Sequence, residues 1–251
     1  MNEYGNNGNG SWRGRANPKP TQMDDVGNGL DRLSLQKERR ANVVDKETLK
    51  VAGILRGSKG DSQRTANNVV IKAQLNELLF YLGREGNWKI SKYGNNVKPL
   101  LDDDKKGVEA DVYLWNDDGE YKVIKVSKWW VRHQTPLEFV ENKIIAHNII
   151  FPQTAYWLIG IQYDRGDFLF VLEQSYVRSM KGVKVTQQEI DEDMKKRGFD
   201  KDGSAYYSDN YIISDLNSKN VLKGVDNELY YIDPIIYPKT KITKYISKKN
   251  Q

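Results

Sequence analysis

The sequence predicts an α+β fold, because two segments with hairpin character flank a segment with the signals of a helix start. Apolar and polar side chains alternate in residues 108–126 around the turn Asn116-Asp-Asp-Gly119, and strand-like runs join at Asp164-Arg-Gly166 within 156–174. Between them, Thr135-Pro-Leu-Glu138 combines an N-cap residue, a proline at the first helical position and a capping-box acid. We therefore expect antiparallel hairpins packed against helices.

The length of 251 residues suits one domain with extensions. Asn, Gly, Pro and charged residues dominate 1–28, which predicts a disordered tail. Patchy helical spacing predicts short helices in 29–56, with Asp45 as a possible N-cap, followed by a linker that ends at residue 67. We expect a compact domain over 68–237 and a basic tail over 238–251.

Two further helices follow from apolar spacing and from their end signals. The first begins near Asn68 and ends at Gly83, a natural C-terminal stop. The second is polar and extends from Thr186 to about Arg197. Residues 84–99 are rich in turn formers, and residues 199–212 connect the second helix to the next motif.

The net charge of +5 is unevenly distributed: residues 1–66 carry +4, residues 67–237 carry −4 and residues 238–251 carry +5. Basic ends are compatible with weak nucleic-acid contact through the tails, or simply with solvated flanks.

The absence of cysteine excludes disulfides and thiolate metal sites, and two histidines argue against zinc. No apolar run reaches membrane-spanning length and no signal-like region is present, so we expect no membrane contact and a cytoplasmic location.

The motif with the strongest chemical content is Ile213-Ser-Asp-Leu-Asn-Ser-Lys-Asn-Val-Leu222, followed by Tyr231-Ile-Asp-Pro-Ile-Ile236. It places Asp215 five residues before Asn220, with Asp233 at the end of a later apolar run. Phosphoryl transfer needs a group that orients a hydroxyl and groups that hold Mg²⁺ against phosphate. Asp215 would serve the first purpose, and Asn220 and Asp233 the second. The alternative is that all three residues only cap or form turns.

Two upstream charges are candidates for the same site. Lys125 lies among aliphatic residues of a predicted strand, where a buried ammonium needs an anion such as phosphate, unless it lies on the solvent face. Glu141 shares a helical face with Leu137 and Ile144, so it points towards the core and needs a cation. Lys125 would be that cation. His147, near the helix end, is expected to cap or pack.

The order of these elements resembles the protein-kinase-like fold. In that resemblance, Gly107, Ala110 and Val112 belong to the glycine-rich loop, in which Lys105 replaces the first glycine. Lys125 and Glu141 are the strand lysine and its helix partner. The remaining correspondences are a hinge that meets adenine through backbone groups (Glu173 and Gln174), a catalytic loop (Asp215 and Asn220) and a metal-binding aspartate (Asp233).

The resemblance implies an antiparallel N-lobe sheet with one main helix and a reduced C-lobe, since only 18 residues follow Asp233. The amino-acid sequences of the two motifs most resemble those of the polyvalent protein kinase domains of bacteriophages and mobile elements, especially of Bacteroidetes. The sequence departs from common kinases at Ser214, at Asn217 and in the Pro-Ile pair after Asp233, which puts regulation by an activation loop in doubt.

The resemblance also implies an ATP- and Mg²⁺-dependent phosphotransferase in a bacterial host cell, or one delivered by a phage, that acts on a hydroxyl of an unknown protein or small-molecule acceptor. One alternative is a catalytically inactive pseudokinase or nucleotide-binding interaction module. Another is a nucleic-acid-binding protein that uses its basic tails, with Trp12 and Tyr245 as stacking residues.

Overall fold

The structure is a computed structural model that describes residues 44–57, 67–100 and 107–239. The predictions for the tail 1–28, for helix before residue 44, for most of the linker and for the tail beyond Lys239 lie outside these residues. So do Trp12, Lys105 and Tyr245.

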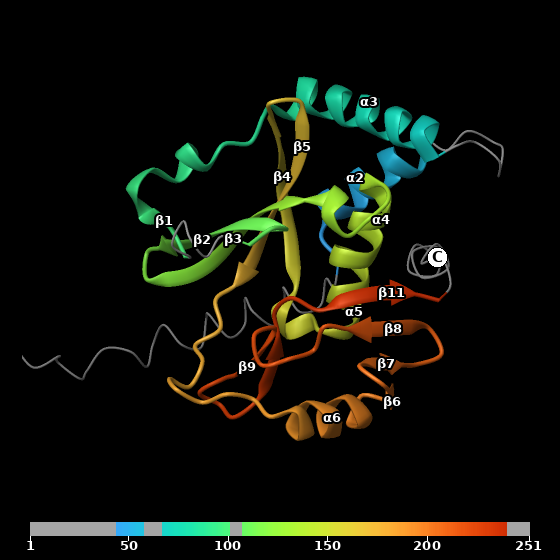
Figure 1. The fold of residues 1–251 in the computed structure, drawn as a ribbon. Coiled ribbons are helices and arrows are strands. Elements are labelled where there is room, and N and C mark those ends of the chain that lie inside the picture. Colours follow the sequence, from blue (N-terminus) through green and yellow to red (C-terminus); the bar gives the residue numbers. More distant parts are fainter. Residues whose placement is uncertain (1–43, 58–66, 101–106, 240–251) are drawn as a thin grey trace, which may run out of the picture. The chain divides into compact units, whose positions relative to one another are not determined.

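A five-stranded antiparallel sheet forms one half of the described domain (Figure 1). Its strands are β1 (Val97–Pro99), β2 (Ala110–Asp117), β3 (Glu120–Lys128), β4 (Tyr156–Asp164) and β5 (Asp167–Ser175), in the order β1-β2-β3-β5-β4. Both predicted hairpins are confirmed. Each turns through a residue pair with positive φ, Asp118-Gly119 and Arg165-Gly166, which is the conformation that two-residue hairpin turns prefer.

The predicted helix after Thr135 is confirmed, and it changes its winding along its length. It begins as α4 (Pro136–Phe139), continues as the π-helix η4 (Val140–Ala146) and ends as α5 (His147–Ile150). Thr135 caps it by accepting a hydrogen bond from the Glu138 amide at 3.1 Å. The π segment widens the helical turn, which alters the faces on which later side chains lie.

Two helices precede the sheet in sequence, α2 (Lys46–Gly57) and α3 (Asn67–Glu85). Asp45 caps α2 as predicted, since its Oδ1 accepts from the Thr48 amide at 2.8 Å. The sequence did not predict how this helix packs. In the structure α2 packs closely, because Val51, Ala52 and Leu55 are fully buried in the main core. The helix contacts β4, α4 and η4.

The other half of the described domain contains α6 (Gln187–Lys196), whose capping box joins Thr186 and Glu189. A four-stranded antiparallel sheet has the order β11-β8-β7-β6, and β9 pairs with β10. The strands are β6 (Asp200–Asp202), β7 (Ala205–Tyr207), β8 (Tyr211–Ser214), β9 (Val221–Lys223), β10 (Leu229–Tyr231) and β11 (Ile235–Pro238). The β9–β10 pair fits the two apolar runs of the motif, whereas β6 and β7 were not predicted.

One main hydrophobic core joins these elements and fixes the segment from β8 to β11 against the long helix. Phe151, which follows α5, stacks on Tyr231 of β10 with 4.4 Å between ring centroids. The turn that carries Asn220 and the bend that carries Asp233 are thereby held next to the end of the long helix. In the described ranges, no helix is long and apolar enough to cross a membrane.

Candidate functional site

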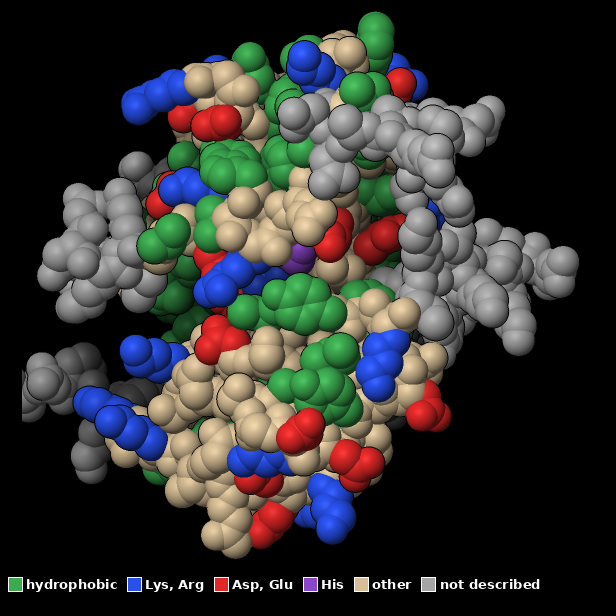
Figure 2. Space-filling model, turned by 45° about the vertical axis from the view of Figure 1, so that its right-hand side comes forward, with side chains coloured by type: hydrophobic (Ala, Val, Ile, Leu, Met, Phe, Trp, Pro, Cys, Tyr) green, Lys and Arg blue, Asp and Glu red, His purple; other side chains and the backbone are tan. Residues whose placement is uncertain are grey.

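A pocket of about 530 Å³ lies between the five-stranded sheet and the segment from Lys219 to Ile236. This volume lies in the range of sites for small molecules and cofactors. Its walls carry five basic side chains and two carboxylates: Lys125, Lys128, Arg132, Lys143, Lys219, Glu109 and Asp233. The excess of positive charge favours an anionic ligand. Figure 2 shows basic and acidic side chains close together on this side of the molecule, with a histidine among them.

Of the residues predicted for the glycine-rich loop, Gly107, Ala110 and Val112 line this pocket, and Lys105 lies outside the described residues. Gly107 precedes β2, and Ala110 and Val112 belong to its first three residues. The backbone is tight here, because a Cβ on Gly107 would lie 3.3 Å from the Ala110 carbonyl oxygen. The Glu109 carbonyl accepts from the Lys128 amide at 2.8 Å, which ties the start of β2 to the end of β3.

Lys125 projects from β3 into the interior and not to solvent, so the solvent-face alternative does not apply. Its side chain is 9% exposed. The ammonium donates to the Tyr156 hydroxyl at 3.0 Å and to the Ile232 carbonyl at 2.9 Å. Burial lowers the pKa of Lys125 to about 8, with a further contribution from nearby Lys143, while Asp233 opposes the shift.

Asp233 lies directly after the carbonyl that Lys125 binds, and three donors converge on its Oδ1 atom. Lys143 forms an ion pair with it, the Lys125 ammonium lies 3.7 Å away, and the Tyr156 hydroxyl lies at 3.3 Å. Removal from water raises the pKa of Asp233, but Lys125 and Lys143 together outweigh this effect and hold the pKa well below its ordinary value. The carboxylate is therefore ionised at neutral pH.

Asp215 and Asn220 are joined by the loop between β8 and β9. Asp215 is exposed and has a left-handed backbone, with φ of 60°. Its carbonyl accepts from the Asn220 amide nitrogen at 2.8 Å, and its carboxylate accepts from Asn217 at 2.8 Å. Because the Asn220 amide nitrogen is used in this way, its side-chain oxygen is the atom that could face a cation. The Asn220 carbonyl accepts from the Ile232 amide at 2.9 Å, which places Asn220 beside Asp233.

Glu141 is not the partner of Lys125 in this structure. It accepts instead from Arg56 of α2 at 3.0 Å and lines a second pocket, away from the cleft. The expected Lys125–Glu141 pair assumed α-helical periodicity over residues 137–148, whereas 140–146 form a π-helix. On this wider turn, Lys143 is the residue that reaches the cleft.

The two predicted hinge residues differ in their placement. The Gln174 side chain is buried at the cleft and donates to the Thr154 carbonyl at 2.7 Å. Glu173 points away and pairs with Lys122 at 3.4 Å. The backbones of both residues are paired on either side, because β5 lies between β3 and β4. The cleft wall continues through Ser175, the last residue of β5, to Tyr176 and Val177.

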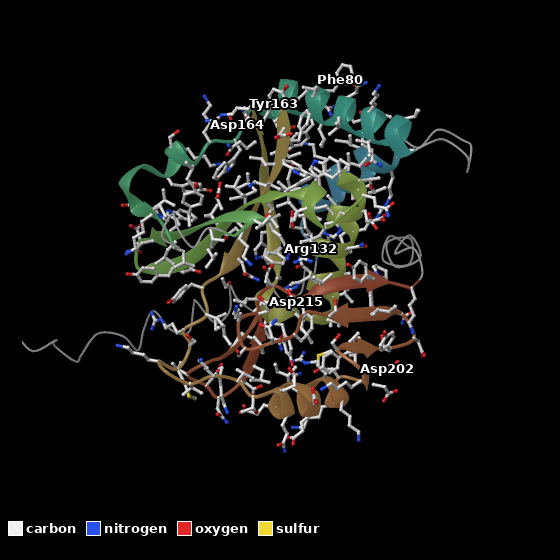
Figure 3. The ribbon with its side chains drawn as sticks, in the orientation of Figure 1. Phe80, Arg132, Tyr163, Asp164, Asp202 and Asp215 are labelled. Atoms are coloured by element: carbon white, nitrogen blue, oxygen red, sulfur yellow. The ribbon has the colours of Figure 1, made fainter. Side chains whose placement is uncertain are left out.

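Sequence reasoning missed three side chains of the site: Lys143, Tyr156 and Arg132. Lys143 had no local sequence signal, because the burial of its neighbours Asn142 and Ile144 is seen only in the structure. Tyr156, at the start of β4, had none. Figure 3 shows Arg132 near Asp215 at the centre of the described domain, and Glu109 and, more weakly, Asp215 raise the pKa of the Arg132 guanidinium.

The two histidines do not supply acid–base groups at neutral pH. Burial lowers the pKa of His147 to about 3, and that of His133, at the cleft wall, to about 4. His147 Nε2 lies 2.8 Å from the Thr154 carbonyl, so His147 packs in the core as expected.

The residues at the cleft fit a nucleotide with Mg²⁺. The described residues contain no cluster of three or more His, Asp or Glu side chains that could form a complete protein cage for a metal. Mg²⁺ is usually held by one or two protein groups together with phosphates and water, and an Asn oxygen and an ionised Asp are suitable ligands. The surrounding lysines are positively charged and would therefore attract the negatively charged phosphates.

Comparison with protein families gives the context for this geometry. A search of curated proteins found no match to the chain. A family model described as a serine/threonine/tyrosine kinase found in polyvalent proteins matches residues 72–240, which is more than half of the chain and includes every predicted site residue. The resemblance noted in the sequence is thereby confirmed, and the chain belongs to the family of serine/threonine/tyrosine kinases found in polyvalent proteins.

Proposed function

We propose that this protein is an ATP- and Mg²⁺-dependent phosphotransferase that acts on a hydroxyl group. The observation that carries the proposal is the convergence of Lys125, Asn220 and Asp233 on one basic cleft in a kinase-family domain. The five-stranded sheet with the helix over 136–150 would form the N-lobe. The segment from α6 to β11 would form a reduced C-lobe.

Each side chain has a role that follows from its position. Lys125 would bind the α- and β-phosphates, since its ammonium is fixed by Tyr156 and the Ile232 carbonyl. The backbone from Gly107 to Val112 would cover the phosphates, and the wall from Gln174 to Val177 would contact the adenine. Asn220 and Asp233 would hold Mg²⁺, which supplies charge neutralisation at the transferred phosphoryl group.

Asp215 would orient the acceptor hydroxyl and accept its proton. Its exposure and its place on a loop beside Asn220 suit a group that must reach an incoming substrate. Asn217 steadies the carboxylate by donating to it at 2.8 Å. Positioning and electrostatics account for most of the catalysis in phosphoryl transfer, so this set of residues supports the proposed reaction.

A second function is favoured by two contacts: Glu141 is bound by Arg56, and Lys143 is paired with Asp233, the proposed metal ligand. This arrangement suits a nucleotide-binding module that does not transfer phosphate. The two functions differ in whether phosphate leaves ATP.

Transfer of γ-labelled phosphate separates them. The protein would be incubated with labelled ATP and Mg²⁺, alone and with a bacterial extract that supplies acceptors. The phosphotransferase should label itself or a component of the extract. Asp215→Asn should lower the rate at least about a hundredfold, as expected for loss of a general base, while ATP still binds. Binding without transfer in the unmodified protein would favour the module.

A further inference from the structure

Lys143 has a position that the proposed roles leave unexplained. It projects from the π-helix η4, its side chain is 11% exposed, and its ammonium forms an ion pair with Oδ1 of Asp233. Asp233 is the proposed metal ligand. Mg²⁺ binds oxygen at about 2.0–2.1 Å, so a cation on this carboxylate would lie within a few ångströms of the Lys143 ammonium and repel it. Lys143 and Mg²⁺ therefore compete for Asp233.

The charges around Lys143 do not balance. Lys125 and Lys143 share the single carboxylate of Asp233. The other cleft carboxylate, Glu109, is bound by Arg132, and Glu141 of the same helix is bound by Arg56. A half-buried site with two ammonium groups and one carboxylate attracts a further anion, and a phosphate group supplies it.

The Tyr156 ring would allow the Lys143 ammonium to move from Asp233 towards a phosphate in the cleft. The ring of Tyr156 lies beneath both ammonium groups, with 4.9 Å from its centroid to Lys125 Nζ and 5.6 Å to Lys143 Nζ. An ammonium retains this cation–π attraction while it shifts across the ring. The flexible stem of lysine allows such a shift without movement of the helix. Lys143 also lines the cleft, so an incoming phosphate lies within its reach.

We propose that Lys143 is an exchangeable counter-ion: it binds Asp233 in the nucleotide-free protein, is drawn to the terminal phosphate of a bound nucleotide, and leaves Asp233 fully once Mg²⁺ binds there. The inference rests on the proposed function, because it assumes that the cleft takes a magnesium nucleotide. The proposal makes Lys143 a phosphate-binding residue in addition to Lys125, Asn220 and Asp233, which form the kinase-like pattern. It also predicts that removal of Lys143 has opposite effects on phosphate and on metal.

Binding of a non-hydrolysable ATP analogue tests this proposal without reference to activity. Affinity would be measured by calorimetry in EDTA and then at increasing Mg²⁺, for the wild type, Lys143→Met and Lys143→Arg. Lys195→Met, on the exposed side of α6, is the matched control. Loss of one charge-assisted hydrogen bond should weaken metal-free binding of the analogue to Lys143→Met about tenfold. Mg²⁺ should enhance binding of the analogue to this variant half-maximally at a several times lower Mg²⁺ concentration than in the wild type. The reason is that Lys143 no longer competes with Mg²⁺ for Asp233.

Lys143→Arg retains the charge and should bind the metal-free analogue almost as the wild type does. If Lys143→Met matches the wild type in metal-free affinity and in Mg²⁺ dependence, the proposal is overturned and Lys143 is only a structural counter-ion. If the wild type itself does not bind the analogue at any Mg²⁺ concentration, the proposed function fails instead.

Amine labelling of the wild type followed by mass spectrometry tests the same exchange if Lys143→Met does not fold. Mg²⁺ should increase the labelling of Lys143 by releasing it from Asp233, and addition of the analogue should then protect it. Lys195 serves as the internal reference and should label equally in all states. Unchanged labelling of Lys143 in the presence of a bound magnesium analogue would refute the exchange.

Discussion

Arg56 of α2 donates to Glu141 of η4 at 3.0 Å, and this contact connects a helix ahead of the matched residues 72–240 to the helix beside the cleft. The side chains of Arg56 and Glu141 are 21% and 16% exposed. The pair is thus largely removed from water. This pair and the buried side chains of Val51, Ala52 and Leu55 attach α2 to the same folded domain as the matched residues.

Arg56→Met should destabilise the protein, because it leaves the Glu141 carboxylate in a poorly hydrated position without its cation. Removal of one member of a fully buried pair costs several kcal/mol, so we expect about 2 kcal/mol for this partly exposed one. Thermal unfolding should show a decrease in Tm of several degrees. Lys50→Met is the control on the same helix, because the Lys50–Glu85 pair is exposed to solvent and should contribute little to stability. Equal effects of the two substitutions would contradict this account of α2.

Binding of ADP in the absence of metal should weaken as the pH rises from 7 to 9. Lys125 is charged below its pKa of about 8 and loses its attraction for phosphate above it. An ordinary lysine would titrate only near 10.4. The groups that face this ammonium are Asp233, Lys143 and Tyr156, and burial keeps the pKa of Tyr156 well above its ordinary value, so it stays neutral. Titration calorimetry at several pH values measures the effect.

Lys125→Arg is the control for the pH series, because a guanidinium remains charged throughout this range. Its affinity for ADP should vary less between pH 7 and pH 9 than that of the wild type. A wild-type affinity that is constant over this range would show that Lys125 either does not contact phosphate or is not shifted.

Gly160 of β4 should not tolerate alanine. A Cβ at this position would lie 2.7 Å from Cδ1 of Trp88, which is buried at 5% exposure, and the strand register shifts at this point. Overpacking of this kind costs about 1–3 kcal/mol. Gly53→Ala gives the opposite expectation, because Gly53 lies exposed within α2 with open space around it, and alanine there should stabilise by about 1 kcal/mol. Urea denaturation of both variants tests the pair, and a stable Gly160→Ala would contradict the close approach of Trp88.

The fold was predictable from sequence where local signals are strong. The turns at Gly119 and Gly166 identify both hairpins, and the caps at Thr135 and Thr186 identify the helix starts, because these signals act within a few residues. The short strand β6 was not predictable. Its residues Asp200–Asp202 are exposed and charged, so only pairing with β7 makes them a strand.

The candidate site was predictable in its types of residue but not in its pairings. The spacing of Asp215, Asn220 and Asp233 indicated a shared loop region, and the structure places Asn220 and Asp233 at one cleft with Lys125. The exchange of partners between Glu141 and Lys143 could not be inferred, because it depends on the π-helical winding and on a salt bridge from α2. Neither the winding nor the salt bridge has a local sequence signal.

Thermal unfolding with ATP and Mg²⁺ tests most directly whether the cleft binds a magnesium nucleotide. The Tm of the wild type should rise on addition of ATP, and further with Mg²⁺, since ligand at about a hundredfold excess over Kd stabilises the folded state by about 2.7 kcal/mol. In Asp233→Ala the additional rise from Mg²⁺ should disappear. An unchanged Tm in the wild type, at every concentration of ATP and Mg²⁺ tested, would contradict the assignment of this cleft.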